Sequence, residues 1–570
     1  MSFMTTYHRW LTETAGNQEL QAELDSIRGD QAAIEDRFYR ELEFGTGGLR
    51  GVLGAGTNRM NVYTVAKATQ GYSNYLKKHF ETPSVAIAYD SRIHSELFTQ
   101  TAASVFAANR ILVNLYPRLM PTPALSFAVR DLHCSGGVVI TASHNPAQYN
   151  GYKVYGPDGC QITTEAAKEI QAEIDLIDPF DQVRWMDFHE GVNRDVIAYI
   201  GEDLVLRYLR AVGTTSVLGK STPHDISIVY TPLNGTGISC VPQCLRKCGF
   251  TNIVIPDEQK NPDGNFPTCP YPNPEVREAL TVGLDWARRT NSDLLLATDP
   301  DCDRVGAAVR SGDDYVLING NEMGVLLLDF ICRMRQANGT MPQRPVAIKT
   351  IVTTPMAVKI AGHYGVELID VLTGFKFIGE QIGLLEQRGE ADRFIFGFEE
   401  SYGYLSGSFV RDKDGVNASL LICEMFAWYQ AQGRSLLDVL GELYERYGCY
   451  QSRLLTFAFE GSAGFARMQA LMAGLRETPP GEIAGYAVEA VGDYQQSVLT
   501  RRDGTQEEIR LPRSNVLRFF LSGGLEAVVR PSGTEPKLKV YITAVGAGLP
   551  ASSAAADRLA EYFAHWADGK

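Results

Sequence analysis

The chain has 570 residues, of which 45% are hydrophobic and 21% charged, and its formal net charge at pH 7 is −14. These proportions are typical of a soluble globular protein, and the length predicts about three or four domains. The acidic balance argues against general binding to nucleic acids or to anionic membranes, although it leaves room for a local basic pocket.

Targeting signals and a disulfide framework are not expected. Residues 1–6 lack the basic and apolar regions of a signal peptide, and no apolar run approaches the ~20 residues of a membrane span. Ten scattered cysteines indicate reduced thiols and a cytoplasmic protein. Cys240, Cys244 and Cys248 recur along one helical face, where burial explains them better than a metal site, because no CxxC pair or histidine accompanies them.

The first part of the chain alternates strands and helices. Residues 7–43 have the apolar spacing of helices. Strands are predicted at 85–89, 111–116 and 137–141, helices at 96–109 and 123–131, a polar loop at 148–159 and a further helix from about Thr164. This β-α-β-α-β order predicts a largely parallel sheet.

Two more α/β units and a different C-terminal part follow. The second unit has predicted strands at 226–230, 252–255 and 294–297, and the third at 346–351, 366–371 and 393–396. From about residue 450 the strands look antiparallel, at 453–459, 516–521, 525–529 and 538–544, with one helix between them and one at the end. The sequence therefore predicts three consecutive α/β domains with mixed, largely parallel sheets and a C-terminal α+β domain, at residues 1–208, 209–322, 323–448 and 449–570.

Polar clusters follow one strand of each predicted α/β unit. Ser143 and His144 follow strand 137–141, three aspartates follow strand 294–297, and the run 399–401 (Glu-Glu-Ser) follows strand 393–396. An isolated Ser-His turn is more often purely structural. Ligands, however, collect where strands of such sheets end, so three clusters at equivalent strand ends predict one shared cleft.

Asp299, Asp301 and Asp303 alternate directly after an apolar strand. Carboxylates this close repel by on the order of 4 kcal/mol per pair at 4 Å and a moderate dielectric. Their hard oxygen atoms favour Mg²⁺ or Ca²⁺ over a solvated acidic turn, which is the alternative. An EF-hand is excluded, because Arg304 and Arg310 stand where that loop needs glycine and glutamate.

Two segments have the composition of anion sites. The glycine-rich stretch 44–51 contains Arg50, which stands where a dinucleotide fingerprint needs its last glycine. The stretch 530–537 joins arginine, two hydroxyls, a glycine and lysine, which suits phosphate. The alternatives are a tight turn with a surface arginine and a polar hairpin. Lys153, near Ser143 in the same predicted loop, is either part of the site or simply solvated.

These features together indicate a class of reaction. A serine that can carry a phosphoryl group, a divalent metal, hydroxyl-binding acids and a second phosphate site predict phosphoryl transfer between a serine and a phosphorylated polyol.

Four segments carry a resemblance to a known family. Residues 141–146, 299–304, 397–401 and 530–534 resemble, in this order, the phosphoserine, metal, sugar and phosphate loops of the α-D-phosphohexomutase superfamily. Residues 44–50, 399–401 and 411–415 resemble most the branch that holds long bacterial phosphoglucomutases and phosphopentomutases. Phe398 stands where many members carry an acid, and the spacing to Ser401 favours Glu399 over Glu400 as the residue that meets the sugar.

The resemblance implies four domains around a central cleft. It also implies an enzyme that interconverts glucose 1-phosphate and glucose 6-phosphate. Phosphorylated Ser143 would be the donor, glucose 1,6-bisphosphate the intermediate and activator, and one Mg²⁺ the cofactor, held by Ser143, Asp299, Asp301 and Asp303. Arg50 and Arg304 would lie near the phosphoryl group, and Lys153 or His144 would carry the proton. The other substrate-binding residues implied are Thr373, Gly374, Lys376, Glu399, Ser401, Lys413, Arg530, Ser532, Gly533, Thr534 and Lys537.

The resemblance leaves alternatives open. The same mechanism on mannose, glucosamine or pentose phosphates is one, and a metal-assisted sugar phosphatase is a less favoured one. We expect a monomer or homodimer that binds phosphosugars and neither nucleic acid nor membrane. Because phosphoryl transfer must exclude water, we also expect the last domain to close over the cleft through Arg530.

Overall fold

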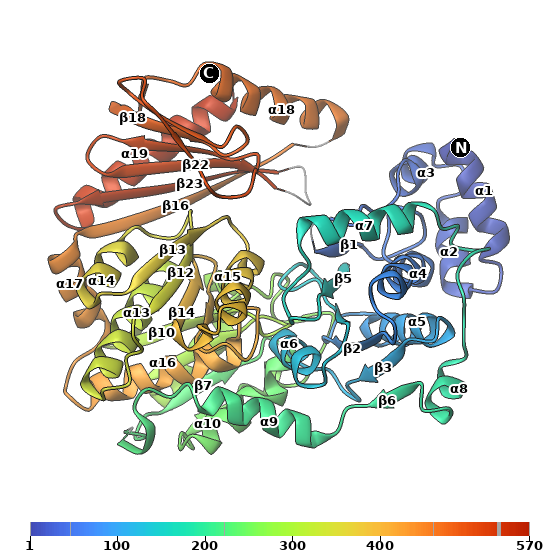
Figure 1. Cartoon of the computed structure of the whole chain (residues 1–570), viewed down its shortest axis with the longest axis horizontal. Coiled ribbons are helices and arrows are strands. Elements are labelled where there is room, and N and C mark those ends of the chain that lie inside the picture. The colour runs from blue at the N-terminus through green and yellow to red at the C-terminus, as the bar shows by residue number, and fades with distance from the viewer. Residues whose placement is uncertain (1, 46, 222, 460, 533–536, 569–570) are drawn as a thin grey trace.

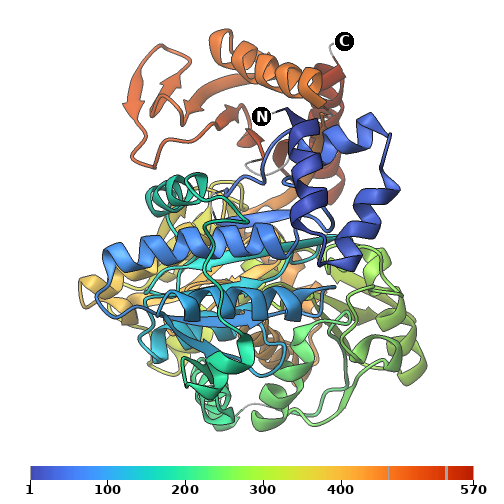
Figure 2. The ribbon, with the colours of Figure 1, turned by 90° about the vertical axis from the view of Figure 1, so that its right-hand side faces the viewer.

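The computed structural model describes residues 2–45, 47–221, 223–459, 461–532 and 537–568. Within these residues three α/β units, each with its own mixed sheet, precede a C-terminal domain with an antiparallel sheet, which confirms the predicted fold class. The C-terminal domain stands above the α/β units in both Figure 1 and Figure 2. No helix of the described part combines the length and hydrophobicity that a membrane span requires.

The first unit is built on a six-stranded sheet in the order β1-β5-β4-β2-β3-β6. The strands are β1 (Gly48–Val52), β2 (Ser84–Tyr89), β3 (Leu112–Leu115), β4 (Gly136–Ile140), β5 (Tyr149–Tyr155) and β6 (Ile197–Tyr199). The helices are α1 (Phe3–Glu13), α2 (Gln18–Ser26), α3 (Gln31–Phe38), α4 (Val62–His79), α5 (Ser95–Ala108), α6 (Thr122–Asp131), α7 (Thr164–Asp175), α8 (Phe188–Asn193) and α9 (Glu202–Gly213).

The helical prediction for residues 7–43 was confirmed up to Phe38, where the structure has three helices, because Asn17 and Asp30 cap new helix starts with their side chains. The prediction of a loop at 148–159 was wrong. The predicted loop 148–159 contains β5, which pairs antiparallel with both β1 and β4. The polar residues of β5 obscured the pattern, but Tyr152 and Val154 are fully buried strand residues.

The second unit has a five-stranded sheet in the order β11-β10-β9-β7-β8. The strands are β7 (Ile228–Thr231), β8 (Ile253–Val254), β9 (Leu294–Thr298), β10 (Val305–Ser311) and β11 (Asp314–Ile318), and the α-helices are α10 (Val241–Lys247), α11 (Asp257–Lys260) and α12 (Thr281–Thr290). The antiparallel hairpin of β10 and β11 was not predicted. Cys240 and Cys244 are buried, as predicted, and Cys248 is half-buried.

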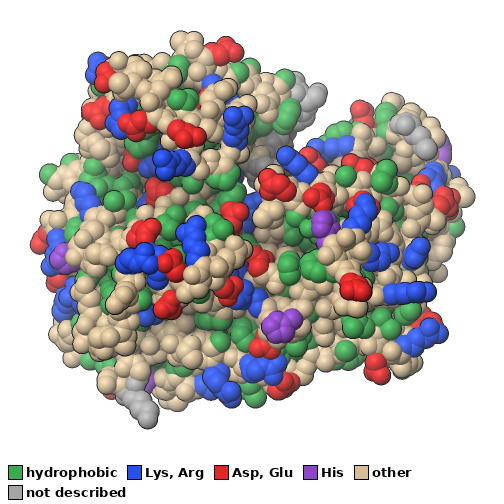
Figure 3. All heavy atoms as spheres, viewed as in Figure 1, with side chains coloured by type: hydrophobic (Ala, Val, Ile, Leu, Met, Phe, Trp, Pro, Cys, Tyr) green, Lys and Arg blue, Asp and Glu red, His purple; other side chains and the backbone are tan. Residues whose placement is uncertain are grey.

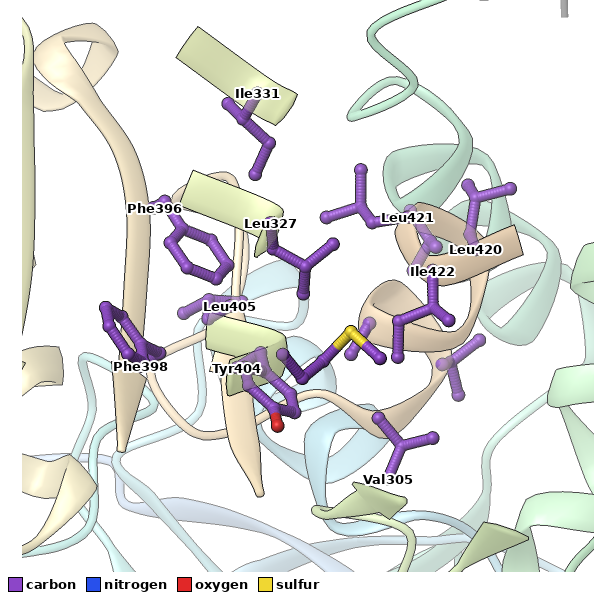
Figure 4. Packing of buried hydrophobic residues seen from close by; sticks show 14 of the residues in the cluster. Val305, Leu327, Ile331, Phe396, Phe398, Tyr404, Leu405, Leu420, Leu421 and Ile422 are labelled. Atoms are coloured by element: carbon purple, nitrogen blue, oxygen red, sulfur yellow. The ribbon is translucent and has the colours of Figure 1, made fainter. Parts of the chain in front are cut away.

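The third unit has a four-stranded sheet in the order β13-β12-β14-β15. Its strands are β12 (Val346–Thr350), β13 (Glu367–Val371), β14 (Phe394–Glu399) and β15 (Gly403–Leu405), and its helices are α13 (Gly320–Ala337), α14 (Met356–Tyr364), α15 (Phe375–Gln387), α16 (Gly415–Gln430) and α17 (Leu436–Tyr447). In Figure 4, Phe396 and Leu405 of this sheet pack against Leu327 of α13.

The C-terminal domain has an antiparallel sheet in the order β16-β23-β22-β21-β18-β19-β20, with β17 beside β18. Its strands are β16 (Cys449–Ala458), β17 (Glu482–Ile483), β18 (Tyr486–Asp493), β19 (Val498–Arg501), β20 (Gln506–Glu508), β21 (Leu517–Leu521), β22 (Leu525–Pro531) and β23 (Lys537–Gly546), and its helices are α18 (Gly461–Glu477) and α19 (Leu549–Asp568).

The hydrophobic core is divided between the α/β units and the C-terminal domain, which is the domain expected to close over the cleft. One cluster of buried side chains runs through all three α/β units, whereas the C-terminal sheet and its helices have a cluster of their own. A smaller cluster joins the two parts, with Ile351 and Leu372 on one side and Val516, Val528 and Tyr541 on the other. The α/β units therefore pack against one another more extensively than they pack against the C-terminal domain.

Candidate active site

Ser143 lies in a strained loop directly after β4. Its φ angle is 53°, in the left-handed region that serine seldom adopts, and the residue is 4% exposed. The Ser143 backbone N–H donates a hydrogen bond of 2.8 Å to Thr141 Oγ1. Backbone strain of this kind persists only where the surroundings enforce it, and it is common at functional sites.

The Ser143 hydroxyl points at the loop of the second unit that carries the three aspartates. It donates a 2.8 Å hydrogen bond to Asp299 Oδ2, and it lies 3.1 Å from His144 Nδ1. The Thr122 hydroxyl, from the first unit, also reaches across to Asp301 Oδ2 at 3.1 Å. Two of the polar clusters predicted at strand ends therefore meet, although 156 residues separate the serine from Asp299.

Asp299, Asp301 and Asp303 form a buried cluster in which one oxygen of each lies within 4.8 Å of the others. Burial and the two neighbouring carboxylates raise the pKa of Asp299 well above its usual range. Asp301 Oδ1 and Asp303 Oδ1 are buried and accept no hydrogen bond from the described residues. Unpartnered hard oxygen atoms this close together fit a divalent cation such as Mg²⁺.

Lysines from the first and third units neutralise part of this charge. Lys153, which lies on β5 and not in a loop, donates to Asp301 Oδ2 at 2.7 Å and to Asp303 Oδ2 at 3.5 Å. Lys413 Nζ lies 3.2 Å from Asp303 Oδ2 and 3.1 Å from Asp412 Oδ1. Burial opposes the charge on Lys153, but the two carboxylates outweigh it and raise its pKa.

Basic residues lie near Ser143 and its neighbour His144. Arg304 forms an ion pair with Glu275, and its Nε lies 3.9 Å from Asp303 Oδ1. Arg50 lies on β1, opposite Gly151 of β5. Burial, followed by the charges of Arg304 and Arg50, holds the pKa of His144 well below its usual value. Arginines near a buried histidine that stays neutral suit an anionic ligand such as a phosphoryl group.

The third unit contributes Glu399 from the end of β14. Glu399 Oε1 accepts a 2.9 Å hydrogen bond from the Gly374 N–H, which is possible because Gly374 has a φ of 120°. Burial raises the pKa of Glu399, although Lys413 and Arg304 oppose this effect. The Thr373 hydroxyl beside it is buried and has no hydrogen-bond partner among the described residues.

The two neighbours of Glu399 face elsewhere. Phe398 is fully buried and stacks on Phe396, with ring centroids 5.4 Å apart. Glu400 accepts hydrogen bonds of 3.3 Å from the Thr350 and Thr353 hydroxyls, and burial with the Glu399 charge raises its pKa to about 7.

Two other predicted residues, Lys376 and Ser401, belong to this unit. Lys376 is in the first turn of α15, with its Nζ 5.2 Å from the centroid of the Phe377 ring. Ser401 is half-buried in the turn between β14 and β15.

The C-terminal domain presents basic residues toward the site. Arg530 of β22 pairs with Lys539 of β23, and the Ser532 N–H donates to the Lys537 carbonyl at 2.7 Å. Burial and the charges of Arg530 and Arg304 lower the pKa of Lys539, which the sequence analysis did not select. Figure 3 shows the surface hollowed between this domain and the first unit. The predicted residues Gly533 and Thr534 lie outside the described residues.

Arg92, at the end of β2, was missed by the sequence analysis. Its buried guanidinium donates hydrogen bonds to backbone carbonyls of the loop that carries Ser143. The signal was available, because Asp90 and Arg92 follow a buried strand just as Ser143 and the three aspartates do.

Known family models match the three α/β units in their order along the chain. Models of "Phosphoglucomutase/phosphomannomutase, alpha/beta/alpha domain" I, II and III match residues 41–179, 206–312 and 319–447. A Staphylococcus saprophyticus protein named phosphoglucomutase is 37% identical over 509 residues, which cover 89% of this chain and 91% of that protein.

Solved structures share the fold at lower identity. A putative phosphomannomutase from Thermus thermophilus has a TM-score of 0.68 and 22% identity, covering 93% of this chain and 99% of that chain. Aspergillus fumigatus N-acetylphosphoglucosamine mutase, in complex with GlcNAc-6P and magnesium, has a TM-score of 0.50 and 14% identity, covering 93% and 95%.

Proposed function

The chain belongs to the phosphoglucomutase/phosphomannomutase family, and from that premise we propose that it interconverts glucose 1-phosphate and glucose 6-phosphate. The observation that carries the proposal is the 2.8 Å hydrogen bond from the Ser143 hydroxyl to Asp299, which joins a candidate phosphoryl carrier to a candidate metal site. The name phosphoglucomutase on a relative 37% identical to this chain supports glucose as the sugar.

In the proposed reaction, phosphorylated Ser143 gives its phosphoryl group to the free hydroxyl of the hexose phosphate. The Ser143 oxygen is the leaving group, and glucose 1,6-bisphosphate forms. The bisphosphate reorients and returns its other phosphoryl group to Ser143. Arg50 and Arg304 would stabilise the group in transit, while Thr373, Gly374, Lys376, Glu399, Ser401 and Lys413 would orient the sugar.

We propose that Asp299, Asp301 and Asp303, together with the Ser143 phosphate, hold one Mg²⁺. Bound there, the ion supplies positive charge that offsets the charge on the phosphoryl group. The unpartnered carboxylate oxygens support this assignment, and so does the magnesium in the Aspergillus fumigatus mutase structure. We also propose that the enzyme acts in the cytoplasm, as a monomer or homodimer.

Lys153 is the better placed of the two candidate proton carriers. Its ammonium group contacts Asp301 and Asp303, and Asp303 also contacts Lys413 of the third unit, where the sugar would bind. His144 instead lies 3.1 Å from the Ser143 hydroxyl and is influenced by the charges of Arg304 and Arg50, so it suits binding of the phosphoryl group. A divalent cation on Asp301 and Asp303 would weaken the effect of these carboxylates on Lys153 and lower its pKa toward a value that suits proton transfer.

We expect Lys153→Met to lower kcat by about 10²- to 10⁴-fold, the usual contribution of a general acid or base. His144→Gln should cost less than a tenth of that factor, because glutamine keeps a polar group beside Ser143. Steady-state kinetics between pH 6 and 9 measure both effects. A larger loss in His144→Gln than in Lys153→Met would assign the proton to His144.

Arg530 is proposed to hold the non-reacting phosphate together with Ser532, Gly533, Thr534 and Lys537. We expect Arg530→Ala to raise KM for glucose 1-phosphate by about 10- to 100-fold, since charge-assisted hydrogen bonds contribute on the order of 1.5–3 kcal/mol. Arg502, an exposed arginine of the same domain, provides the matched alanine control. An unchanged KM in Arg530→Ala would show that Arg530 does not bind the non-reacting phosphate.

One assay tests the function as a whole. Purified protein is incubated with Mg²⁺, glucose 1-phosphate and a trace of glucose 1,6-bisphosphate, and both glucose 6-phosphate and free phosphate are measured. Accumulation of glucose 6-phosphate supports the proposal, while stoichiometric free phosphate would make the protein a phosphatase. Faster turnover of mannose, glucosamine or ribose 1-phosphate would reassign the substrate.

A further inference from the structure

A buried arginine lies beneath the loop that carries Ser143. The Arg92 guanidinium donates to the carbonyl of Ser143 at 2.5 Å, to those of Pro146 and Tyr149 at 2.9 Å each, and to that of Asn145. These four carbonyls belong to one segment, residues 143–149, which we call the serine loop. The planar, rigidly arranged donors of arginine suit such a set of acceptors, whereas a lysine ammonium offers only three.

The Arg92 guanidinium is itself held in place by Asp90, another residue of the first unit. Arg92 Nε lies 3.4 Å from Asp90 Oδ2, and neither side chain is exposed. The same carboxylate oxygen accepts the Thr141 hydroxyl at 2.6 Å, and Thr141 Oγ1 in turn accepts the Ser143 N–H at 2.8 Å. Asp90 and Arg92 therefore fix Ser143 from both of its backbone polar groups.

The second unit covers the other side of Arg92. The Phe266 ring lies 5.1 Å from the guanidinium carbon, within the range of a cation–π contact. Gly264 packs so closely that a Cβ there would lie 2.5 Å from the Ile93 nitrogen and 2.6 Å from the Ser91 carbonyl oxygen. The unit that supplies Asp299 is thus packed against the turn that supplies Arg92.

We propose that Arg92 is the positioning residue of the phosphoryl carrier. Its guanidinium holds the strained backbone of Ser143 by the carbonyl, so that the hydroxyl of the same residue faces Asp299. Arg92 is buried under the serine loop, and the contacts of its guanidinium described above are with protein groups, so it acts through Ser143 and not on the sugar. The inference rests on the proposed phosphoryl transfer through Ser143.

Three variants test this role. Arg92→Met removes the donors, Arg92→Lys keeps the charge and part of the donors, and Phe266→Leu removes only the ring that covers Arg92. Arg393→Met is the control, because Arg393 is also buried and donates to a backbone carbonyl, that of Arg344 at 2.8 Å, at the start of β14. Each protein is compared with wild type for kcat, KM and hydrogen exchange of residues 143–149.

We expect Arg92→Met to lower kcat by about 10²-fold with KM within about threefold, since a misplacement of 1 Å can cost that factor. Arg92→Lys should recover part of the loss, and Phe266→Leu should show a smaller loss of the same kind. Hydrogen exchange of residues 143–149 should become faster in all three. Arg393→Met should lower the melting temperature and leave kcat unchanged.

Two results would overturn the inference. One is a kcat equal to wild type in folded Arg92→Met or, where that variant does not fold, in both Arg92→Lys and Phe266→Leu. The other is a rise in KM at constant kcat, which would place Arg92 in substrate binding. Failure of the proposed function is distinguishable, because it shows as wild-type protein that does not convert glucose 1-phosphate.

Discussion

Ser143→Ala lowers the conversion of glucose 1-phosphate to glucose 6-phosphate by at least about 10⁴-fold, the largest effect we expect from a single substitution. In the proposed mechanism Ser143 carries the phosphoryl group, and loss of a covalent carrier removes this route for the reaction. Removing a catalytic nucleophile elsewhere costs on the order of 10⁶ in kcat. The uncatalysed alternative is among the slowest reactions known, so little background conversion masks the loss.

The measurement pairs activity with the mass of the intact protein. After incubation with glucose 1,6-bisphosphate, wild type should gain one phosphoryl group and Ser143→Ala none. Ser73→Ala is the matched control, because the Ser73 hydroxyl is also buried but donates to the Thr69 carbonyl of its own helix at 2.7 Å, within α4. Turnover near the wild-type rate in Ser143→Ala would show that another residue, or direct transfer, carries the phosphoryl group.

The sequence was most informative where local pattern and chemistry coincide. Short β-branched or apolar runs predicted the strands before Ser143, Asp299 and Glu399, and a polar residue at such a strand end is a local signal. The structure brings all three clusters into one region. The choice of Glu399 over Glu400 as the residue that meets the sugar also followed from spacing, and it stays a prediction.

What the sequence did not reveal depends on contacts between distant segments. Lys153 was placed in a loop because β5 is polar, and only its pairing with β1 and β4 makes it a strand. Arg92 follows a buried strand, which was a local signal, but its partners are carbonyls more than 50 residues away, and the strand-end position alone does not reveal them. Lys539 is a strand residue whose relevance comes from the position of the C-terminal domain relative to Arg304.

Asp299→Asn should lower activity by about 10³-fold or more and make the metal-free protein more stable. Positive charge from a bound ion is worth several kcal/mol to phosphoryl transfer, and about 1.4 kcal/mol is tenfold in rate. Asparagine keeps a carbonyl oxygen for the Asp303 and Arg304 N–H groups, which donate to Asp299 Oδ1 at 3.1 and 2.9 Å. It removes one of three buried carboxylates that repel one another when no ion is bound.

Thermal unfolding with and without Mg²⁺ separates these effects. Wild type should melt at a higher temperature when Mg²⁺ is added, because a ligand that binds the folded state stabilises it. Asp299→Asn should show little of this shift but should melt above wild type in EDTA. Because the Asp299 pKa is raised on folding, metal-free wild type should lose stability as the pH rises from about 4 through that raised pKa, and the variant should lose less.

Asp329→Asn is the control that distinguishes repulsion from a general effect of removing a buried acid. Asp329 is fully buried on α13, but it is ion-paired with Arg333 at 3.1 Å and accepts the Tyr364 hydroxyl at 2.8 Å. Removing its charge should therefore lower the melting temperature and leave the Mg²⁺ shift intact. The buried charge of Asp329 is stabilised by its partners, whereas that of Asp299 is repelled by two neighbouring carboxylates. If Asp299→Asn also melts below wild type in EDTA, the aspartates are held by Lys153 and Lys413 well enough to need no metal ion.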